Sequence, residues 1–381
     1  MKKILLSVAT IATMATVSSA NSEIDTLKTQ MAEMMEKIEK LESSEPSKDV
    51  AKVAHAKTEK KGTLVKSKAP LLKISGKHYL GFVSDNAGDS RTNEFETRRN
   101  YLQIKGYFAE DSKDYMRITL DTFHNTDDDG KDKGSWEVRL KYAYLYLDNV
   151  LPYTGVELGQ AHRPWIDYEE HHGWNYRSIS KVFVEAHNGA HFTNSSDLGI
   201  NFKTKLDYFT SELGVFNGEG YHGVEDGNGL SGEWRLTGHI FGTGKKHVHK
   251  SDTYADISFL GQYNTDYKAK GNDFVWYGVH AVYNQAEFLL AGQYITATDG
   301  GADKEGKGYS VNGEFRVTDA WNLIGRYDYF ELDAGEERKI MLGGLSYRYN
   351  KNVEFIANYV KEEVDNTTEV DALMLTAEVN W

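Results

Sequence analysis

The chain of 381 residues contains no cysteine, so no disulfide bond contributes to its stability. This absence fits a protein of the bacterial envelope that is stable without such bonds. From about residue 71 to the C-terminus the sequence also lacks any convincing amphipathic helix, which argues against a helical fold for this part. The apolar stretch near the N-terminus, from Ile4 to about Val17, is too short for a good membrane-spanning helix.

The N-terminal stretch has instead the order of features found in a secretory signal peptide. Two lysines precede the apolar residues, and the small residues Ser-Ser-Ala, ending at Ala20, follow them. We expect residues 1–20 to be removed by cleavage before Asn21. The alternative is an ordinary N-terminal helix that is buried in the folded protein.

A short heptad pattern follows at residues 21–44. Its apolar residues recur at alternating spacings of three and four, with Glu and Lys between them. We expect a helix that forms a coiled coil, because three heptads are marginal alone and gain stability in an oligomer. The alternative is a helix packed on its own chain. Residues 45–70 are rich in Lys, Ser, Thr and Ala, which is typical of a linker.

From residue 71 onward, aromatic residues and glycines are dense, and apolar and polar residues alternate. This period of two is typical of strands that have one apolar and one wet face. Clusters of Gly, Asp and Asn separate sixteen such runs. The expected strands are residues 71–84, 96–109, 113–124, 135–148, 154–162, 196–205, 207–217, 230–242, 253–264, 273–284, 286–297, 307–317, 320–332, 337–349, 352–361 and 369–381.

The connections between these runs alternate in length. Tight ones such as "KLD", "NQA" and "YNKN" alternate with longer acidic ones such as "NTDDDGKDKG", "NGEGYHGVEDGNG" and "EEVDNTT". Short turns at one end and long loops at the other are typical of a transmembrane β-barrel. We therefore expect an all-β, sixteen-stranded antiparallel barrel at residues 71–381, with both termini and the N-terminal helix in the periplasm. One connection at the short-turn end, "GTGKKHVHKSD" at 242–252, breaks the rule.

The apolar face of each strand is expected to meet lipid, and the charged face a wet lumen. In "EVRLKYAYLYL" we expect lipid to contact Val138, Leu140 and the three tyrosines, opposite Glu137 and Arg139. The 24 tyrosines and 7 tryptophans, often near strand ends, match the aromatic girdles of membrane interfaces. A soluble sandwich would need a core with more small aliphatic residues and fewer tyrosines.

The last ten residues, "ALMLTAEVNW", alternate in the same way. Leu373, Leu375 and Trp381 belong to the face expected to contact lipid. An aromatic last residue with alternating apolar residues before it resembles the signal that the outer-membrane assembly machinery reads. We therefore expect the barrel assembly machinery to be a partner, with Trp381 as part of the signal.

Several segments resemble the bacterial phosphate-selective porin family, the porin O/porin P group. They are "TRRNYLQIKGYFAEDSKDYMRITLDTF", "GVELGQAHRPW", "GVFNGEG" and "GRYDYF…GGLSYRYNKNVEFIANYV". The resemblance covers about residues 71–381. It implies a sixteen-stranded homotrimer in the outer membrane, surrounded by lipid and lipopolysaccharide, with a narrow channel. It also accommodates an N-terminal periplasmic coiled coil.

The longest connection runs from residue 163 to residue 195. The resemblance implies that this loop folds into the lumen and forms a constriction, and its charged residues would then line it. The alternative is a solvated lid that lies outside the barrel. The candidate constriction residues are Arg163, Asp167, Glu169, Glu170, Arg177 and Lys181.

Anion selectivity would require rings of Arg and Lys along the lumen. Acidic residues share that face, and residues 71–381 carry a net charge of −16, because 12 of the 44 Lys and Arg and 9 of the 57 Asp and Glu precede them. We therefore expect passive diffusion of small hydrophilic solutes or ions, with weak or no preference for phosphate. The candidate basic pore-lining residues are Arg99, Lys105, Arg117, Arg139, Lys141, Arg235, Arg316, Arg326 and Arg348. The acids on that face are Asp121, Glu137, Glu157, Glu233, Glu314 and Asp328.

The sequence offers little evidence for a metal site, a cofactor site or a catalytic site. Five histidines lie in or next to the long loop, but their spacing matches no known metal site. The "HVHK" segment is expected to be an exposed turn, no cofactor motif is complete, and the acidic chain offers no basic patch for nucleic acid. We expect no enzymatic activity. The alternatives are an outer-membrane barrel enzyme, an adhesin or envelope tether, and, last, a soluble β-sandwich.

Overall fold

A computed structural model describes most of the chain from residue 71 onward. The described residues are 71–88, 91–109, 112–126, 132–221, 223, 229–267, 270–300 and 304–381. The expected signal peptide (1–20), coiled coil (21–44) and linker (45–70) lie outside them. Within the described ranges, no helix is long and apolar enough to cross a membrane.

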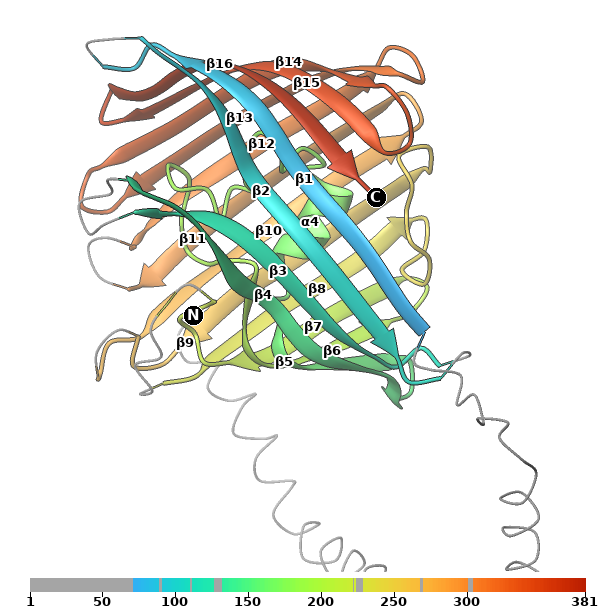
Figure 1. The fold of residues 1–381 in the computed structure, drawn as a ribbon. Coiled ribbons are helices and arrows are strands. Elements are labelled where there is room, and N and C mark those ends of the chain that lie inside the picture. The colour runs from blue at the N-terminus through green and yellow to red at the C-terminus, as the bar shows by residue number, and fades with distance from the viewer. Residues whose placement is uncertain are drawn as a thin grey trace, which may run out of the picture. The chain divides into compact units, whose positions relative to one another are not determined.

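The described residues form sixteen strands and one short α-helix, labelled in Figure 1. In chain order these are β1 (Leu71–Asp85), β2 (Thr92–Tyr107), β3 (Tyr115–Thr126), β4 (Asp132–Leu151), β5 (Thr154–His162), α4 (Ile166–His172), β6 (Ser196–Lys205), β7 (Phe209–Phe216), β8 (Ser231–Phe241), β9 (Tyr254–Asn264), β10 (Phe274–Gln285), β11 (Phe288–Asp299), β12 (Gly306–Arg316), β13 (Trp321–Leu332), β14 (Glu337–Arg348), β15 (Val353–Val364) and β16 (Thr367–Asn380).

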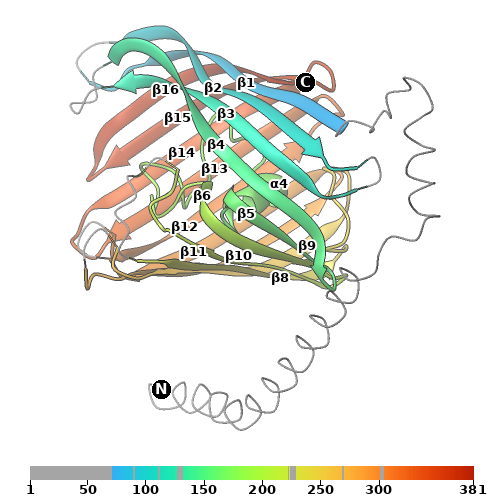
Figure 2. The same ribbon diagram turned by 60° about the horizontal axis from the view of Figure 1, so that its bottom comes forward.

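The strands form one closed antiparallel barrel. Each strand pairs with its neighbours along the chain, and β1 pairs with β16 from Lys77–Asn380 to Asp85–Ala372, which closes the ring (Figures 1 and 2). The predicted fold and strand number are therefore confirmed. Closure leaves no unpaired strand edge.

The two faces of the wall differ as the alternation predicted. In β13, Leu323 is exposed on the outside, whereas Arg326 and Asp328 are buried on the inside. In β8, Glu233 and Arg235 are likewise buried. The outer face is rich in exposed Leu, Ile, Val and Phe, and the inner face in polar groups. This is the reverse of a soluble sandwich and matches a barrel that meets lipid outside and water inside.

A β-bulge in β4 overturns part of the predicted facing. The β3–β4 register shifts between Thr119 and Leu120, so Lys141 is an extra residue in β4. Because side chains alternate with period two, one inserted residue reverses the facing of those that follow. Leu140 faces outward as predicted, but Tyr142 and Tyr144 are buried inside the barrel, and Tyr146 packs against this inner cluster. The prediction that these three tyrosines contact lipid was wrong.

A second bulge lies in β2. The β1–β2 register shifts between Tyr79 and Leu80, which leaves Arg98 as the extra residue. Arg98 and its neighbour Arg99 therefore both point inward. The Arg98 Nη1 atom donates to the carbonyl oxygen of Ser178, at 2.9 Å, and to the hydroxyl of Thr376, at 2.8 Å. Arg98 thus links the barrel wall to segment 163–195 through hydrogen bonds.

The barrel has two distinct ends. We call the end where β1 begins and β16 ends the terminal end, and the other the loop end. Terminal-end connections have two to seven residues, except residues 242–253 between β8 and β9. The last predicted long loop, "EEVDNTT", is instead a two-residue turn. Its residues Asp365 and Asn366 both have positive φ, the geometry that favours a tight hairpin.

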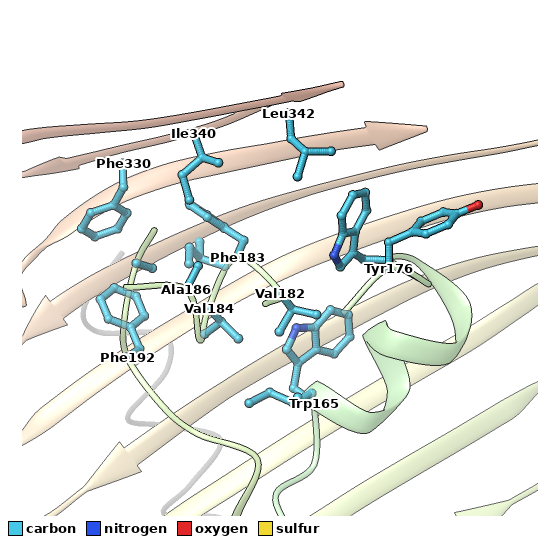
Figure 3. Close-up of a cluster of buried hydrophobic side chains, with 14 of the residues drawn as sticks. Trp165, Tyr176, Val182, Phe183, Val184, Ala186, Phe192, Phe330, Ile340 and Leu342 are labelled. Carbon is cyan, nitrogen blue, oxygen red and sulfur yellow. The ribbon is translucent and has the colours of Figure 1, made fainter. Parts of the chain in front are cut away.

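The long segment 163–195 lies inside the barrel, and the alternative of an external lid is wrong (Figures 2 and 3). Its aromatic and aliphatic side chains, including Trp174, Phe183 and Phe192, are buried against inward-facing residues of β9–β16 such as Phe330 and Leu342. At about 1.5–3 kcal/mol for each large apolar side chain removed from water, this contact holds the segment firmly to one side of the wall.

Candidate functional site

The inserted segment divides the interior unevenly. Its apolar side chains fill the space next to β9–β16, whereas open space remains between α4 and the opposite wall. A cavity of about 350 Å³ lies there, lined by side chains of β1–β5 and of the inserted segment. A second cavity, of about 250 Å³, lies between α4 and strands β6–β8. Asp167 and His171 of α4 line both cavities.

The short helix α4 is amphipathic in a way that fixes its orientation. Ile166 and Tyr168 are buried, and the Tyr168 hydroxyl donates to Asp256 Oδ2 at 2.6 Å. Asp167 and His171, four residues apart, therefore share the face that remains about half exposed. Burial favours the neutral form of the Asp167 carboxyl, but His171 and then His162 outweigh it and hold its pKa below the usual range.

Glu169 belongs to the buried side of α4. Its carboxylate accepts hydrogen bonds from Trp165 Nε1, at 2.6 Å, and from Gln293 Nε2, at 2.5 Å. Burial raises the pKa of Glu169 to about 7, although Arg326 acts in the opposite direction. Glu169 lines neither of the two cavities and serves to attach α4 to the wall.

The other predicted constriction residues form ion pairs. Arg163 forms a buried pair with Glu233, with Nε 2.8 Å from Oε1. Arg177 bridges Glu170 and Glu185 and fixes the fold of the inserted segment. Of the six predicted residues, three line the larger cavity: Asp167, Glu170 and Arg177. Arg163, Glu169 and Lys181 do not, although Lys181 keeps an exposed ammonium 3.8 Å from Glu185.

Three basic residues of β2–β4 have no carboxylate within ion-pair distance among the described residues. They are held by tyrosines instead. The Arg117 guanidinium lies 4.6 Å from the ring centre of Tyr142, Lys141 Nζ donates to the Tyr101 hydroxyl at 2.9 Å, and Lys105 Nζ lies 4.6 Å from the ring centre of Tyr115. Arg117 and Lys141 line the larger cavity, so their charges remain available to a solute.

The remaining predicted basic residues mostly form ion pairs with acids on the same inner face. Arg99 and Arg139 share Asp121, at 3.1 and 3.0 Å. Arg235 pairs with Glu212, Arg316 with Glu314, and Arg326 with Asp328. Arg348 is exposed where β14 reaches the terminal end. These ion pairs stiffen the wall and offset part of its positive charge, although Asp121, Glu212 and Glu314 are each shared by two cations.

The sequence did not reveal several residues that line the interior. Tyr79, Tyr101 and Tyr142 border the larger cavity, and His162 contacts both Glu157 and Arg117, at 3.0 and 3.1 Å. A bulge changes no residue type and disturbs the alternation little, so the alternation alone does not show that Tyr142 faces the lumen. The high density of tyrosine next to Arg and Lys in "EVRLKYAYLYL" was the one available hint.

The loop histidines do not gather into a metal site. In the part of the chain that the structure describes, no group of three or more His, Asp or Glu side chains could hold a metal ion. His187 and His191 lie near one another, with ring centres 5.0 Å apart, whereas His172 stacks on Tyr168.

The sixteen-stranded barrel has the fold of several solved bacterial outer-membrane proteins. Among solved structures, the chain is similar to OmpF of Salmonella typhi in complex with daunomycin, with a TM-score of 0.58 and 16% identity over 82% of this chain and 98% of that one. It is also similar to the anion-selective porin of Comamonas acidovorans, with a TM-score of 0.56 and 13% identity over 81% and 98%.

A third similar structure is the trimer form of OmpT, an outer membrane protein of Vibrio cholerae. Its TM-score is 0.57, with 12% identity over 82% of this chain and 100% of that one. No protein-family model and no curated protein matches the chain. At these identities the likeness is one of fold, and the resemblance to the phosphate-selective family rests on the sequence segments alone.

Proposed function

We propose that this protein is an outer-membrane porin through which small hydrophilic solutes and ions diffuse passively. The observation that carries this proposal is the uneven interior. The inserted segment is fixed by apolar contacts to one half of the wall, and a charged cavity of about 350 Å³ remains along the other half.

The charges of that cavity favour small polar solutes. Asp167 and Glu170 line it from the inserted segment, and Arg117 and Lys141 from the barrel wall. A solute that passes between them exchanges water for contacts with both signs of charge, so pore radius and wall charge decide what passes. The two wall cations without acidic partners give a modest preference for anions. Phosphate is one such anion, without a dedicated selectivity for it.

The assembly and orientation follow from the same proposal. We place the terminal end in the periplasm, because an even number of strands puts both termini there with the short turns. The Trp381 indole lies over Gly76 on the outer face and donates to His78 Nε2 at 2.9 Å, a position suited to the lipid interface and to the proposed assembly signal. A homotrimer agrees with the trimer form of the similar OmpT structure.

Swelling of proteoliposomes tests the proposed function. Vesicles that contain the refolded full chain are diluted into solutions of uncharged sugars of increasing size. We expect swelling rates that fall steeply as the sugar approaches the width of the passage, while vesicles without protein stay unchanged. Absence of swelling with every sugar, for protein shown to be folded by its gel mobility, would favour an adhesin or enzyme.

A further inference from the structure

Residues 242–253, the inserted turn, are the one long connection at the terminal end, and they fold into the mouth of the barrel. Val248 packs against a buried apolar cluster on the inner wall. That cluster consists of Tyr254, Val282, Leu289 and Ala291, from β9, β10 and β11. The turn is therefore attached to the lumen wall at Val248, whereas His247 and His249 on either side are exposed, as predicted for this segment.

Hydrogen bonds from the wall fix the backbone of the inserted turn. Asn284 Nδ2 donates to the carbonyl oxygens of Lys250 and Asp252, at 3.1 and 2.6 Å. Arg316 Nη1 donates to the same Lys250 carbonyl at 2.8 Å. The Asn284 side chain is completely buried, and buried amides of this kind are costly to leave unpaired. The inserted turn therefore has a defined shape.

The inserted turn also meets the segment that enters from the other end of the barrel. Lys250 Nζ lies 4.8 Å from the ring centre of Tyr176 and 3.2 Å from Glu314 Oε1. The ring centres of His247 and His171 lie 6.2 Å apart. Two segments far apart in the sequence thus converge at the terminal-end mouth, where His171 of α4 lies next to His247 of the inserted turn.

A cavity of about 220 Å³ lies at this meeting point, and its lining is unusual for the chain. Nitrogen-bearing side chains dominate it: His171, Asn175, His247, His249, Lys250 and Arg316. No carboxylate lines it. Glu314 lies behind the lining and pairs with Lys250 and Arg316, so it offsets part of their charge. A cavity that has several cationic or N–H-donating side chains and no carboxylate in its lining is unexpected in a protein with a net charge of −13.

We infer that this cavity binds a small oxyanion, such as sulfate, phosphate or a small carboxylate, at the terminal-end mouth of the pore. The inference rests on the proposed porin function and adds a second charged element to it. Neutral imidazoles donate one N–H each, and an approaching anion favours their protonation. Ammonium and imidazolium groups form the strong, charge-assisted hydrogen bonds that oxyanions require. The volume accommodates a four-oxygen anion with some water.

Sulfate is a suitable probe, because it is a stable dianion and does not titrate near neutral pH. Titration calorimetry of the refolded full chain in detergent measures its binding directly. We expect H247Q/H249Q to weaken sulfate binding about tenfold or more, because Gln can still donate a hydrogen bond but cannot carry the positive charge that strengthens it. The matched control is K113Q/K351Q, which removes two positive charges from other terminal-end turns, and it should bind sulfate like the parent chain.

Single-channel recording separates this inference from the proposed function. Sulfate added at the terminal end should block the parent channel at concentrations that do not block H247Q/H249Q. The inference is wrong if the parent chain binds no sulfate, or if the variant and the control lose affinity equally. A chain that binds sulfate through these histidines but carries no current would retain the site and refute the porin.

Discussion

At the scale of single residues, what decides the role of a lumen cation is its partner. Arg139 lies 3.0 Å from Asp121, and this carboxylate offsets part of its positive charge. Arg117 instead contacts Tyr144 and His162, at 3.2 and 3.1 Å, with no carboxylate within reach in the described chain. Two arginines that look alike in the sequence therefore differ in how much of their positive charge an ion in the proposed pore would meet.

We predict that R117Q shifts the reversal potential in a salt gradient toward cations. Removing one unneutralised charge from the cavity wall changes the interaction with an ion by up to about 1 kcal/mol in a water-like environment, or roughly fivefold in the permeability ratio. R326Q/D328N is the matched control, because it removes one positive and one negative charge of an ion pair and leaves the net charge of the wall unchanged. An equal shift in this control would show that the reversal potential does not report the charge of Arg117.

A second residue-scale prediction concerns pH. The pKa of Glu169, about 7 in the folded chain, lies above its unfolded value, because burial favours the protonated acid. The folded state thus holds an extra proton between the unfolded pKa and about 7. Protonated Glu169 therefore stabilises the folded state at low pH. As the pH rises through that window, the free energy of unfolding falls, on the order of 3 kcal/mol in all.

Thermal unfolding measured across pH tests this prediction. The parent chain should lose stability from about pH 5 to pH 7, whereas E169Q, which has no titratable group at this position, should lose clearly less. A parent and variant with parallel pH profiles would contradict the assignment of this carboxyl as the titrating group.

At the scale of elements, the sequence predicted the strands well and their facing less well. All sixteen runs were found, because alternation is a strong local signal over ten or more residues. The bulges at Arg98 and Lys141 were not found, since one inserted residue leaves the composition and most of the alternation unchanged. Their consequence is large, because the inserted residue decides whether Tyr142 and Tyr144 meet lipid or the lumen.

The position of the inserted segment has a signal in the sequence. Inward-facing positions of the later strands include apolar residues such as Ile324, which stands between the inward Asn322 and Arg326. A buried isoleucine is not expected at a position that faces a water-filled lumen. Such residues, together with the tryptophans of the long loop, indicate that the loop packs on this half of the wall.

We predict that F183A loosens the inserted segment from the wall. Phe183 is completely buried, and removing a buried Phe side chain costs about 3–5 kcal/mol. The channel should show larger conductance and more noise as the segment moves, with the barrel still folded. L323A, on the outer face, is the control and should leave the current unchanged. A quiet channel of normal conductance in F183A would mean that the apolar contact does not set the passage.

The buried pair of Arg163 and Glu233 also anchors this segment, at the point where it leaves β5. We predict that R163A destabilises the segment by about 3 kcal/mol or more, because it leaves a buried carboxylate without its partner. R163Q/E233Q, which removes both charges, should cost less. Protease cleavage within residues 163–195 measures the effect, and equal cleavage of single and double variants would argue against a coupled pair.

At the scale of the whole molecule, the closed barrel and the two inserted segments act together. The strands supply a wall that is apolar outside and charged inside. One segment narrows the lumen from the loop end, and the inserted turn meets it from the terminal end. The first could be expected from the resemblance to known porins. The second was visible in the sequence only as an overlong turn, because its contacts join residues far apart in the chain.

Single-channel conductance of the refolded full chain in a planar bilayer tests the central claim most directly. The account predicts stable conductance steps, grouped in threes for a homotrimer, with a modest preference for anions in a salt gradient. It also predicts that F183A changes the size of each step, whereas L323A does not. A folded barrel that inserts into the bilayer and carries no current, in the parent chain and in F183A alike, would contradict the account.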